Sequence, residues 1–202
     1  MPNSMPTPSV QDEEYAQRLV RLQSAGWKRI LDVQAPYRWN LRRQQPGFTL
    51  EIGCGIGRNL IHLSGNGVGI DLNLACVRVA RARSLEAYTP EEFSASTRAV
   101  QGTFDSILLS HVAEHMTSEA VVELLREYLP FLKRGGSVIL IAPQERGQAS
   151  DPTHVEFMDE SALDIVAAAL GLSKTRAYSF PFPRFVGRFF IYNETVWVGT
   201  AP

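Results

Sequence analysis

Short apolar runs and helix-patterned segments alternate along most of this chain. Runs of strand length come before helical patterns at "FTLEI" (48–52), "GVGI" (67–70), "FDSILLS" (104–110) and "SVILIAP" (137–143). A weaker strand is expected near 84–89. The segment "TSEAVVELLREYLPFL" (117–132) repeats its apolar residues at helical spacing and offers Thr117 or Ser118 as an N-cap. Alternation of this kind predicts a parallel sheet with helices on both faces.

The last two apolar runs have no helix between them. They are "SKTRAYSF" (173–180) and "FFIYNETVWVGT" (189–200), and they follow a helical segment (159–172) that Gly171 closes. Strands joined without a crossover helix pair antiparallel, so we expect these two at one edge of the sheet. The whole pattern predicts an α/β fold, a doubly wound and mostly parallel sheet of seven strands with an antiparallel last strand.

The beginning of the chain has a different character. Residues 1–10 are rich in Pro and Ser and are expected to form a flexible tail. A helix is predicted over 11–32 because four apolar residues share one face, namely Tyr15, Leu19, Leu22 and Ile30. We expect a single domain over 11–202, in which a helical part (11–46) covers the substrate and cofactor and a Rossmann-like core spans 47–202.

Composition narrows the partners and the location that we expect. The chain of 202 residues has 20 Lys and Arg against 21 Asp and Glu, a formal net charge of −1, so no nucleic-acid partner is expected. No apolar run approaches the roughly 20 residues that span a bilayer, and residues 1–10 lack a signal-peptide pattern. Cys54 and Cys76 are too few for a disulfide framework. We expect a cytoplasmic protein without membrane insertion, as a monomer or a homodimer.

A glycine-rich loop follows the first strand, in "TLEIGCGIGRNL" (49–60). Gly53, Gly55 and Gly57 allow the backbone to turn sharply and to approach a ligand that a Cβ would obstruct. Asp71 ends the second strand, 20 residues after Glu51, where a carboxylate can accept the hydroxyls of a ribose. The ligand expected at this edge of the sheet is therefore an adenosine derivative.

The spacing of the glycines separates two classes of cofactor. Nicotinamide-binding loops read G-x-G-x-x-G and bind a diphosphate, whereas this loop reads G-x-G-x-G and follows the acidic Glu51, which suits a cationic sulfonium or ammonium. The chain resembles class I S-adenosylmethionine-dependent methyltransferases, whose motifs are similar to "LEIGCGIG", "VGIDLN", "FDSILLSHVAEHM" and "LKRGGSVILIAP" in this order. A nicotinamide oxidoreductase remains the alternative.

The resemblance implies both a topology and a cofactor site. The strand order would be 3-2-1-4-5-7-6, and the cofactor would be S-adenosylmethionine, with its methionine part near the glycine loop and its ribose on Asp71. The residues expected to bind it are Glu51, Gly53, Cys54, Gly55, Gly57, Asn59, Asp71, Leu72 and Ser110. The adenine contact stays unassigned, with candidates at Tyr88, Thr89, Glu91 and Glu92.

Titratable residues follow the fourth strand in "SHVAEHM". The Asn/Asp-Pro-Pro-aromatic pattern of many nucleic-acid base methyltransferases is absent there, which argues against that substrate class. His111, Glu114 and His115 stand at i, i+3 and i+4 and would share one face of a helical turn. A histidine, with His111 favoured, would be the general base, or these residues and His154 would bind a divalent cation such as Mg²⁺. The alternative is that they only brace the following helix.

The acceptor pocket is expected between the leading helices and the late loops. Four residues are predicted to contact the substrate, Tyr37, Arg38, Trp39 and Arg184. Aromatic faces beside hydrogen-bonding groups suit a sugar, and the whole chain resembles mycobacterial methyltransferases that methylate the 1-hydroxyl of mannosides for polysaccharide synthesis. We therefore expect O-methylation of a small-molecule hydroxyl, with a carbohydrate as the acceptor. The alternatives are a quinone, another natural product or a protein acceptor, and a protein that binds the cofactor without catalysis.

Overall fold

The computed structural model describes residues 10–24 and 32–202. The predicted tail lies outside these residues except for Val10, which begins the first helix. So does the part of the predicted helix at 25–31, including Ile30, and nothing is described of the Leu22 side chain. No helix in the described ranges is long and apolar enough to cross a membrane.

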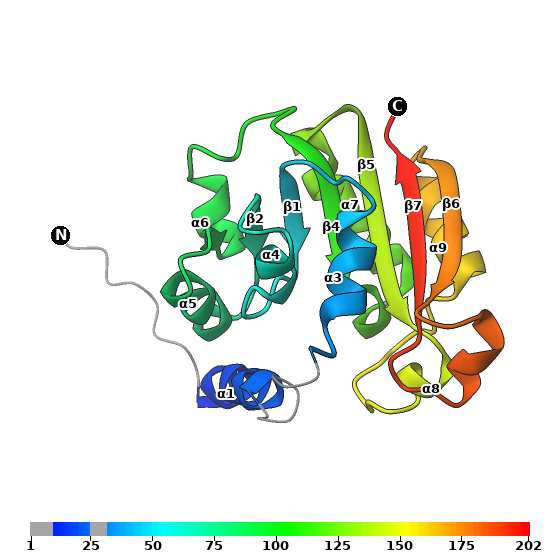
Figure 1. Cartoon of the computed structure of the whole chain (residues 1–202). Coiled ribbons are helices and arrows are strands. Elements are labelled where there is room, and N and C mark those ends of the chain that lie inside the picture. Colours follow the sequence, from blue (N-terminus) through cyan, green and yellow to red (C-terminus); the bar gives the residue numbers. More distant parts are fainter. Residues whose placement is uncertain (1–9, 25–31) are drawn as a thin grey trace.

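Seven strands form one sheet in the order β3-β2-β1-β4-β5-β7-β6 (Figure 1). Strand β7 pairs antiparallel with both of its neighbours, and every other pair in the sheet is parallel. The predicted fold class and strand order are confirmed. The strands are β1 (Thr49–Ile52), β2 (Gly67–Ile70), β3 (Ala87–Tyr88), β4 (Phe104–Ser110), β5 (Leu132–Pro143), β6 (Ser173–Phe180) and β7 (Glu194–Thr200).

Helices cover both faces of this sheet, as Figure 1 shows. Side chains from α3, α4 and α5 pack on one face, and those from α6, α7 and α9 pack on the other. The α-helices are α1 (Val10–Ser24), α3 (Ala35–Arg42), α4 (Arg58–His62), α5 (Leu74–Ala82), α6 (Pro90–Ser94), α7 (Ser118–Tyr128), α8 (Glu145–Gln148) and α9 (Glu160–Ala169). The 3₁₀ turns in the described residues are η1 (Ala113–His115), η2 (Leu129–Phe131) and η3 (Arg184–Arg188).

The central strand β4 shows why a run of apolar residues is needed here. Ile107 and Leu109 pack into the large core beneath α7 and α9, while Leu108 between them packs into the opposite core with Leu41 of α3. Successive side chains of a strand point to opposite faces, so a stretch of strand covered on both sides is apolar at consecutive positions. The run Ile107–Leu109 follows from this burial.

The ends of these strands meet at one edge of the sheet. Ile52, at the end of β1, lies in register with Ile70 of β2 and Leu109 of β4, so the loops that follow these strands emerge side by side. Strand β7 runs the other way and pairs its first residue, Glu194, with Pro143 at the end of β5. This edge therefore combines the carboxyl ends of the parallel strands with the beginning of β7.

One predicted strand is shorter than expected. Strand β7 begins at Glu194, whereas the sequence pattern predicted a strand over 189–200. The buried side chain of Asn193 accepts a hydrogen bond from the Phe182 backbone N–H at 3.0 Å and donates to Gln144 at 2.9 Å. These bonds fold the preceding residues back as a loop. The prediction was wrong here because the pattern of apolar residues does not reveal this side-chain anchor.

Candidate functional site

The glycine loop joins β1 to α4 and turns through three left-handed residues. Gly53, Gly55 and Gly57 have φ angles of +72°, +53° and +80°. A Cβ at Gly53 or Gly57 would lie 2.3 Å from a neighbouring side chain, whereas a Cβ at Gly55 would meet only Leu19 of α1, at 3.6 Å. The outer two glycines thus allow the loop to pack closely, and Gly55 leaves an open face beside α1. Such a face can receive a ligand against the backbone.

Asp71, directly after β2, connects this loop to the neighbouring strand. One of its oxygens accepts the backbone N–H of Gly55 at 2.7 Å, and the other accepts that of Asn73 at 2.8 Å. Burial raises the pKa of the Asp71 carboxyl, and these two bonds oppose that effect. A carboxylate can accept further hydrogen bonds, so Asp71 can hold the loop and still receive a ribose hydroxyl.

Glu51 is a buried carboxyl, and only one of its two oxygens has a hydrogen-bond partner in the described residues. The residue is 2 % exposed, its Oε1 accepts from Asn59 Nδ2 at 2.7 Å, and its Oε2 has no hydrogen-bond partner in the described part of the chain. Burial raises the pKa of Glu51 to about 8, against the opposing effects of Asn59 and Arg58. A buried polar atom without a partner is costly, so a cationic group placed here would gain a carboxylate partner.

The remaining predicted cofactor residues differ in what they expose. Leu72 is 87 % exposed beside Asp71, so its apolar side chain is free to cover a flat ring. Ser110 is buried at the end of β4. The Cys54 side chain packs into the apolar cluster of α4 and α5 with Leu60, so it offers only its backbone to a ligand. The unpaired oxygen of Glu51 fits the methionine tail of S-adenosylmethionine, and the open face at Gly55 fits its sulfonium. The exposed Leu72 fits its adenosine.

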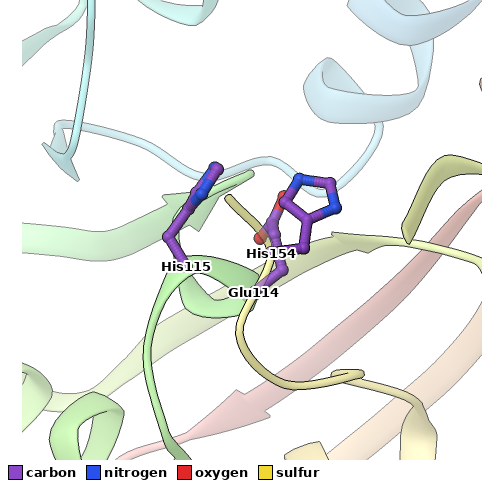
Figure 2. Close-up of side chains that lie close together, drawn as sticks. All are labelled: Glu114, His115 and His154. Carbon is purple, nitrogen blue, oxygen red and sulfur yellow. The ribbon is translucent and has the colours of Figure 1, made fainter. Parts of the chain in front are cut away.

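Beside this loop, η1 and the segment after α8 bring three titratable side chains together. One potential ligand atom from each of Glu114, His115 and His154 lies within 4.8 Å of the other two. Figure 2 shows these side chains with their polar ends turned to the same side. Glu114 is 1 % exposed, and its Oε2 has no hydrogen-bond partner within residues 10–24 and 32–202. The cluster therefore contains an oxygen that is available to a cation.

Hydrogen bonds determine which imidazole nitrogens are available. Nδ1 of His154 lies 2.8 Å from the Gln148 carbonyl, and Nδ1 of His115 lies 3.3 Å from the Thr153 carbonyl. A carbonyl oxygen only accepts, so both Nδ1 atoms donate and each neutral ring keeps its lone pair on Nε2. The two rings meet edge to face, with centroids 4.8 Å apart. Either Nε2 can accept a proton or bind a metal ion.

The loop that carries His154 is fixed to the end of β4 by the backbone. The N–H of Val155 donates to the Glu114 carbonyl at 2.7 Å. The Glu156 carboxylate accepts from both the backbone N–H and the hydroxyl of Ser118, at 2.7 and 2.6 Å. Glu156 therefore joins this loop to the beginning of α7, where Thr117 is the N-cap.

His111 is placed differently from the prediction. The residue has a left-handed backbone (φ 57°), and η1 begins only at Ala113, so His111, Glu114 and His115 do not share one helical face. Its Nδ1 lies 3.3 Å from Glu114 Oε1 and its Nε2 lies 2.8 Å from Glu194 Oε1. The prediction of a shared face was wrong because spacing alone does not show where a helical turn begins.

The two carboxylates also fix the charge of His111. Burial alone would lower the pKa of this imidazole, but the hydrogen bonds to Glu114 and Glu194 outweigh that effect and raise the pKa to about 9. Ionised carboxylates only accept hydrogen bonds, so both ring nitrogens donate and the ring is an imidazolium near neutral pH. This arrangement leaves no lone pair for a proton from a substrate.

Glu194 is a residue of this site that the sequence did not indicate. It lies at the first position of β7, 83 residues after His111, and its side chain is 11 % exposed. The stretch "YNETVWVG" carries no motif that singles it out. The only available signal was topological, because the first residue of an antiparallel last strand lies where the parallel strands end.

The four residues predicted to contact the substrate lie in different parts of the structure. Tyr37 donates a hydrogen bond to the Tyr192 carbonyl at 2.9 Å, and burial together with Glu194 raises the pKa of its hydroxyl. Arg184 pairs with Glu145 at 2.5 Å. Arg38 and Trp39 line a shallow depression on α3 that does not include the histidine cluster. Of the four, Tyr37 is therefore the one associated with Glu194.

Comparison with known families identifies the chain. A family described as "Methyltransferase domain" matches residues 20–177, which include the glycine loop, Asp71 and the cluster after β4. The chain belongs to this methyltransferase family. S-adenosylmethionine is the cofactor that the fold implies.

Individual relatives agree with this assignment. The chain is 35% identical over 98 residues to the ubiquinone biosynthesis O-methyltransferase of Albidiferax ferrireducens, a match that covers 44% of this chain and 38% of the relative. A TehB-like S-adenosylmethionine-dependent methyltransferase from Corynebacterium glutamicum has a TM-score of 0.65 at 19% identity, covering 95% and 98% of the two chains. A methyltransferase from Haloferax volcanii, solved with the activator Trm112, has a TM-score of 0.69 at 19% identity over 96% and 98%. These two structures share the fold.

Proposed function

We propose that this methyltransferase transfers the methyl group of S-adenosylmethionine to a hydroxyl oxygen of a small molecule. The observation that carries the proposal is the cluster of Glu114, His115 and His154 beside the glycine loop. When bound, the cofactor supplies an electrophilic methyl group on a sulfonium. The protein then has to position an oxygen nucleophile in line and remove its proton.

Two residues of the cluster fit the removal of that proton. The lone pairs of His115 and His154 lie on Nε2, because both Nδ1 atoms donate to carbonyl groups. His154 comes from a loop that is bonded to the backbone at Glu114, so its ring is held at the mouth of the site. We assign the general base to one of these two histidines. His111, with both of its nitrogens directed at carboxylates, takes no proton from the substrate.

The same three residues fit a divalent cation. Two neutral imidazoles and a carboxylate are ligands that transition metal ions accept, and carboxylate oxygen suits Mg²⁺. The unpaired Oε2 of buried Glu114 supports this reading, because an ion would provide the partner that the oxygen lacks. When bound, such a cation would lower the pKa of an acceptor hydroxyl. Metal dependence is thus part of the proposal. An imidazole that binds the ion through Nε2 cannot also accept a proton, so one histidine would be the ligand and the other the base.

Two observations bear on the class of acceptor. The relative from Albidiferax ferrireducens is described as a ubiquinone biosynthesis O-methyltransferase, which favours an oxygen acceptor, although this chain spans only 38% of that protein. Tyr37, whose hydroxyl pKa is raised by burial and by the charge of Glu194, is a polar aromatic residue suited to a phenol or a sugar. A carbohydrate acceptor stays a prediction from the sequence, beside a quinone or phenol.

A labelled-methyl assay tests the proposal. Sugars, phenols, carboxylates and amines are offered with S-adenosylmethionine, each with added Mg²⁺ and with a chelator. We expect transfer to a hydroxyl, loss of transfer on chelation, and a decrease of about 100-fold or more in kcat for His154→Ala or His115→Ala, in the range of general-base catalysis. Glu86→Gln, which alters an ion pair with Arg98 away from the cluster, is the matched control for Glu114→Gln.

Each alternative has its own outcome in this assay. Transfer only to amines would replace the O-methyltransferase assignment. Activity unchanged by the chelator would remove the cation and leave the histidine base. No transfer to any acceptor, with the cofactor bound tightly, would favour a protein that binds the cofactor without catalysis.

A further inference from the structure

Glu194, His111 and Glu114 form a continuous chain of ionic contacts across three segments. Glu194 Oε1 lies 2.8 Å from His111 Nε2, and His111 Nδ1 lies 3.3 Å from Glu114 Oε1. The His111 backbone is fixed as well, because its N–H donates to the Ile141 carbonyl of β5 at 2.9 Å. The ring is therefore held at its backbone and at both nitrogens.

The two oxygens of Glu114 have different surroundings in this chain of contacts. Oε1 faces the His111 ring, while Oε2 is buried and has no partner in the described residues. A free carboxylate can rotate and exchange its two oxygens. The fixed His111 ring restricts that freedom, because rotation would move Oε1 away from a ring nitrogen 3.3 Å away, and the Glu114 residue is only 1 % exposed. One oxygen is thus held by the protein and the other is left for a ligand.

We propose that Glu194 and His111 are positioning residues, which hold Oε1 of Glu114 and thereby keep the unpaired Oε2 for a cation bound with His115 and His154. This inference rests on the cation proposed for that cluster. It adds Glu194 and His111 as residues that orient Glu114, one of the proposed ligands. Partners that orient a metal ligand typically affect metal affinity by about 10- to 100-fold without touching the ion. Glu194 contributes from β7 because that strand begins at the edge where the others end.

Direct binding of Mn²⁺ to the full chain tests the inference without any acceptor. Electron paramagnetic resonance and calorimetry measure Mn²⁺ affinity for the wild type, Glu114→Gln, Glu194→Ala, Glu194→Gln and His111→Asn. Asparagine is chosen because it tolerates a left-handed backbone. We expect Glu194→Ala and His111→Asn to bind Mn²⁺ about 10- to 100-fold more weakly. Glu194→Gln, which keeps an oxygen that can accept from His111, should stay within a few-fold of the wild type.

Two further measurements separate positioning from a purely structural role. S-adenosylhomocysteine affinity should be the same in all variants, since the glycine loop is unaltered, and Glu86→Gln should match the wild type throughout. Unchanged Mn²⁺ affinity in folded Glu194→Ala and His111→Asn, beside a wild type that binds the ion, would overturn the inference and leave the cation site standing. A wild type that binds no Mn²⁺ would overturn both, while a histidine base for methyl transfer would still stand or fall by the labelled-methyl assay.

Discussion

The buried carboxyl groups at the edge of the sheet are in different electrostatic situations. Glu51 has an amide partner and no cation at hydrogen-bonding distance among the described residues, so burial raises its pKa to about 8. Glu114 and Glu194 share an imidazolium. A carboxyl of the first kind is largely protonated near neutral pH and becomes charged when a cation arrives. Binding of the cofactor and release of a proton are therefore linked at Glu51.

This linkage predicts that S-adenosylhomocysteine binds more tightly as the pH rises. The free protein holds a proton on Glu51 below about pH 8, and the ammonium group of the ligand favours the ionised form, so the complex holds fewer protons. Affinity should increase by up to about tenfold for each pH unit between pH 5.5 and 7.5. Calorimetry in buffers of different ionisation enthalpy should detect the released proton.

The control for this prediction is Glu51→Gln. Glutamine keeps an oxygen for Asn59 but cannot ionise, so its binding should be weak and nearly independent of pH. If the wild type and Glu51→Gln show the same pH profile, Glu51 does not contact the ammonium group.

At the level of single residues, sequence reasoning located the glycine loop after β1 and singled out the residues of the cluster of Glu114, His115 and His154. The sequence was enough to single out Gly55, Asp71 and Glu51, because their positions depend on local backbone geometry and on the end of a strand. The role of His111 was not accessible, since it depends on Glu194, which lies 83 residues away in the sequence. Pairings over such distances follow from topology and side-chain packing, which a single sequence does not state.

Among the elements, the loop after α8 contributes one of the three side chains of the cluster. It carries His154, and two tethers hold it, the backbone bond at Glu114 and the Glu156 carboxylate at the beginning of α7. Loops hold functional groups well only when such anchors limit their motion. The position of His154 should therefore depend on a residue that does not face the site.

We predict that Glu156→Gln lowers methyl transfer while the chain stays folded. The amide keeps one acceptor for Ser118 and loses the charge, which should cost about 1–2 kcal/mol of unfolding free energy. The loosened loop should decrease kcat by roughly 10-fold or more, because small displacements of a positioned group have large effects on rate. Affinity for S-adenosylhomocysteine should not change.

Glu160→Gln serves as the comparison, because Glu160 pairs with Lys174 on the surface of α9. Denaturant unfolding, kcat and cofactor affinity are measured on both variants. Equal kcat in the two variants would show that the Glu156 tether does not position His154.

For the molecule as a whole, the cofactor should stabilise the folded state by mass action. A ligand that binds only the folded chain, at 100 times its Kd, contributes about 2.7 kcal/mol. For a chain of this length that corresponds to a rise of about 5–10 °C in Tm. We predict this shift with S-adenosylhomocysteine and none with NAD. A shift with NAD alone would favour the nicotinamide oxidoreductase.

The overall topology was predictable to a large extent. Buried strands such as β4 require uninterrupted apolar runs, and the absence of a helix between 180 and 189 indicated the antiparallel pair. The first and last residues of the helices and strands were harder to predict from the sequence. Strand β5 begins at Leu132, five residues before the apolar run, because Leu132 pairs with Phe104 at the beginning of β4 and the regular pairing resumes only at Ser137. The polar residues at this irregularity leave no apolar pattern that would predict a strand.

The reversed direction of β7 makes the carboxyl terminus a convenient attachment point. Glu194 lies at the reactive edge, and Thr200 pairs with Ser137 near the other edge of the sheet, so the last residues emerge on the side away from the cofactor loop (Figure 1). The first helix, in contrast, packs beside that loop through Ala16 and Ile56. A surface or fluorophore coupled after Pro202 should leave turnover intact, whereas the same group coupled to α1 should interfere with it.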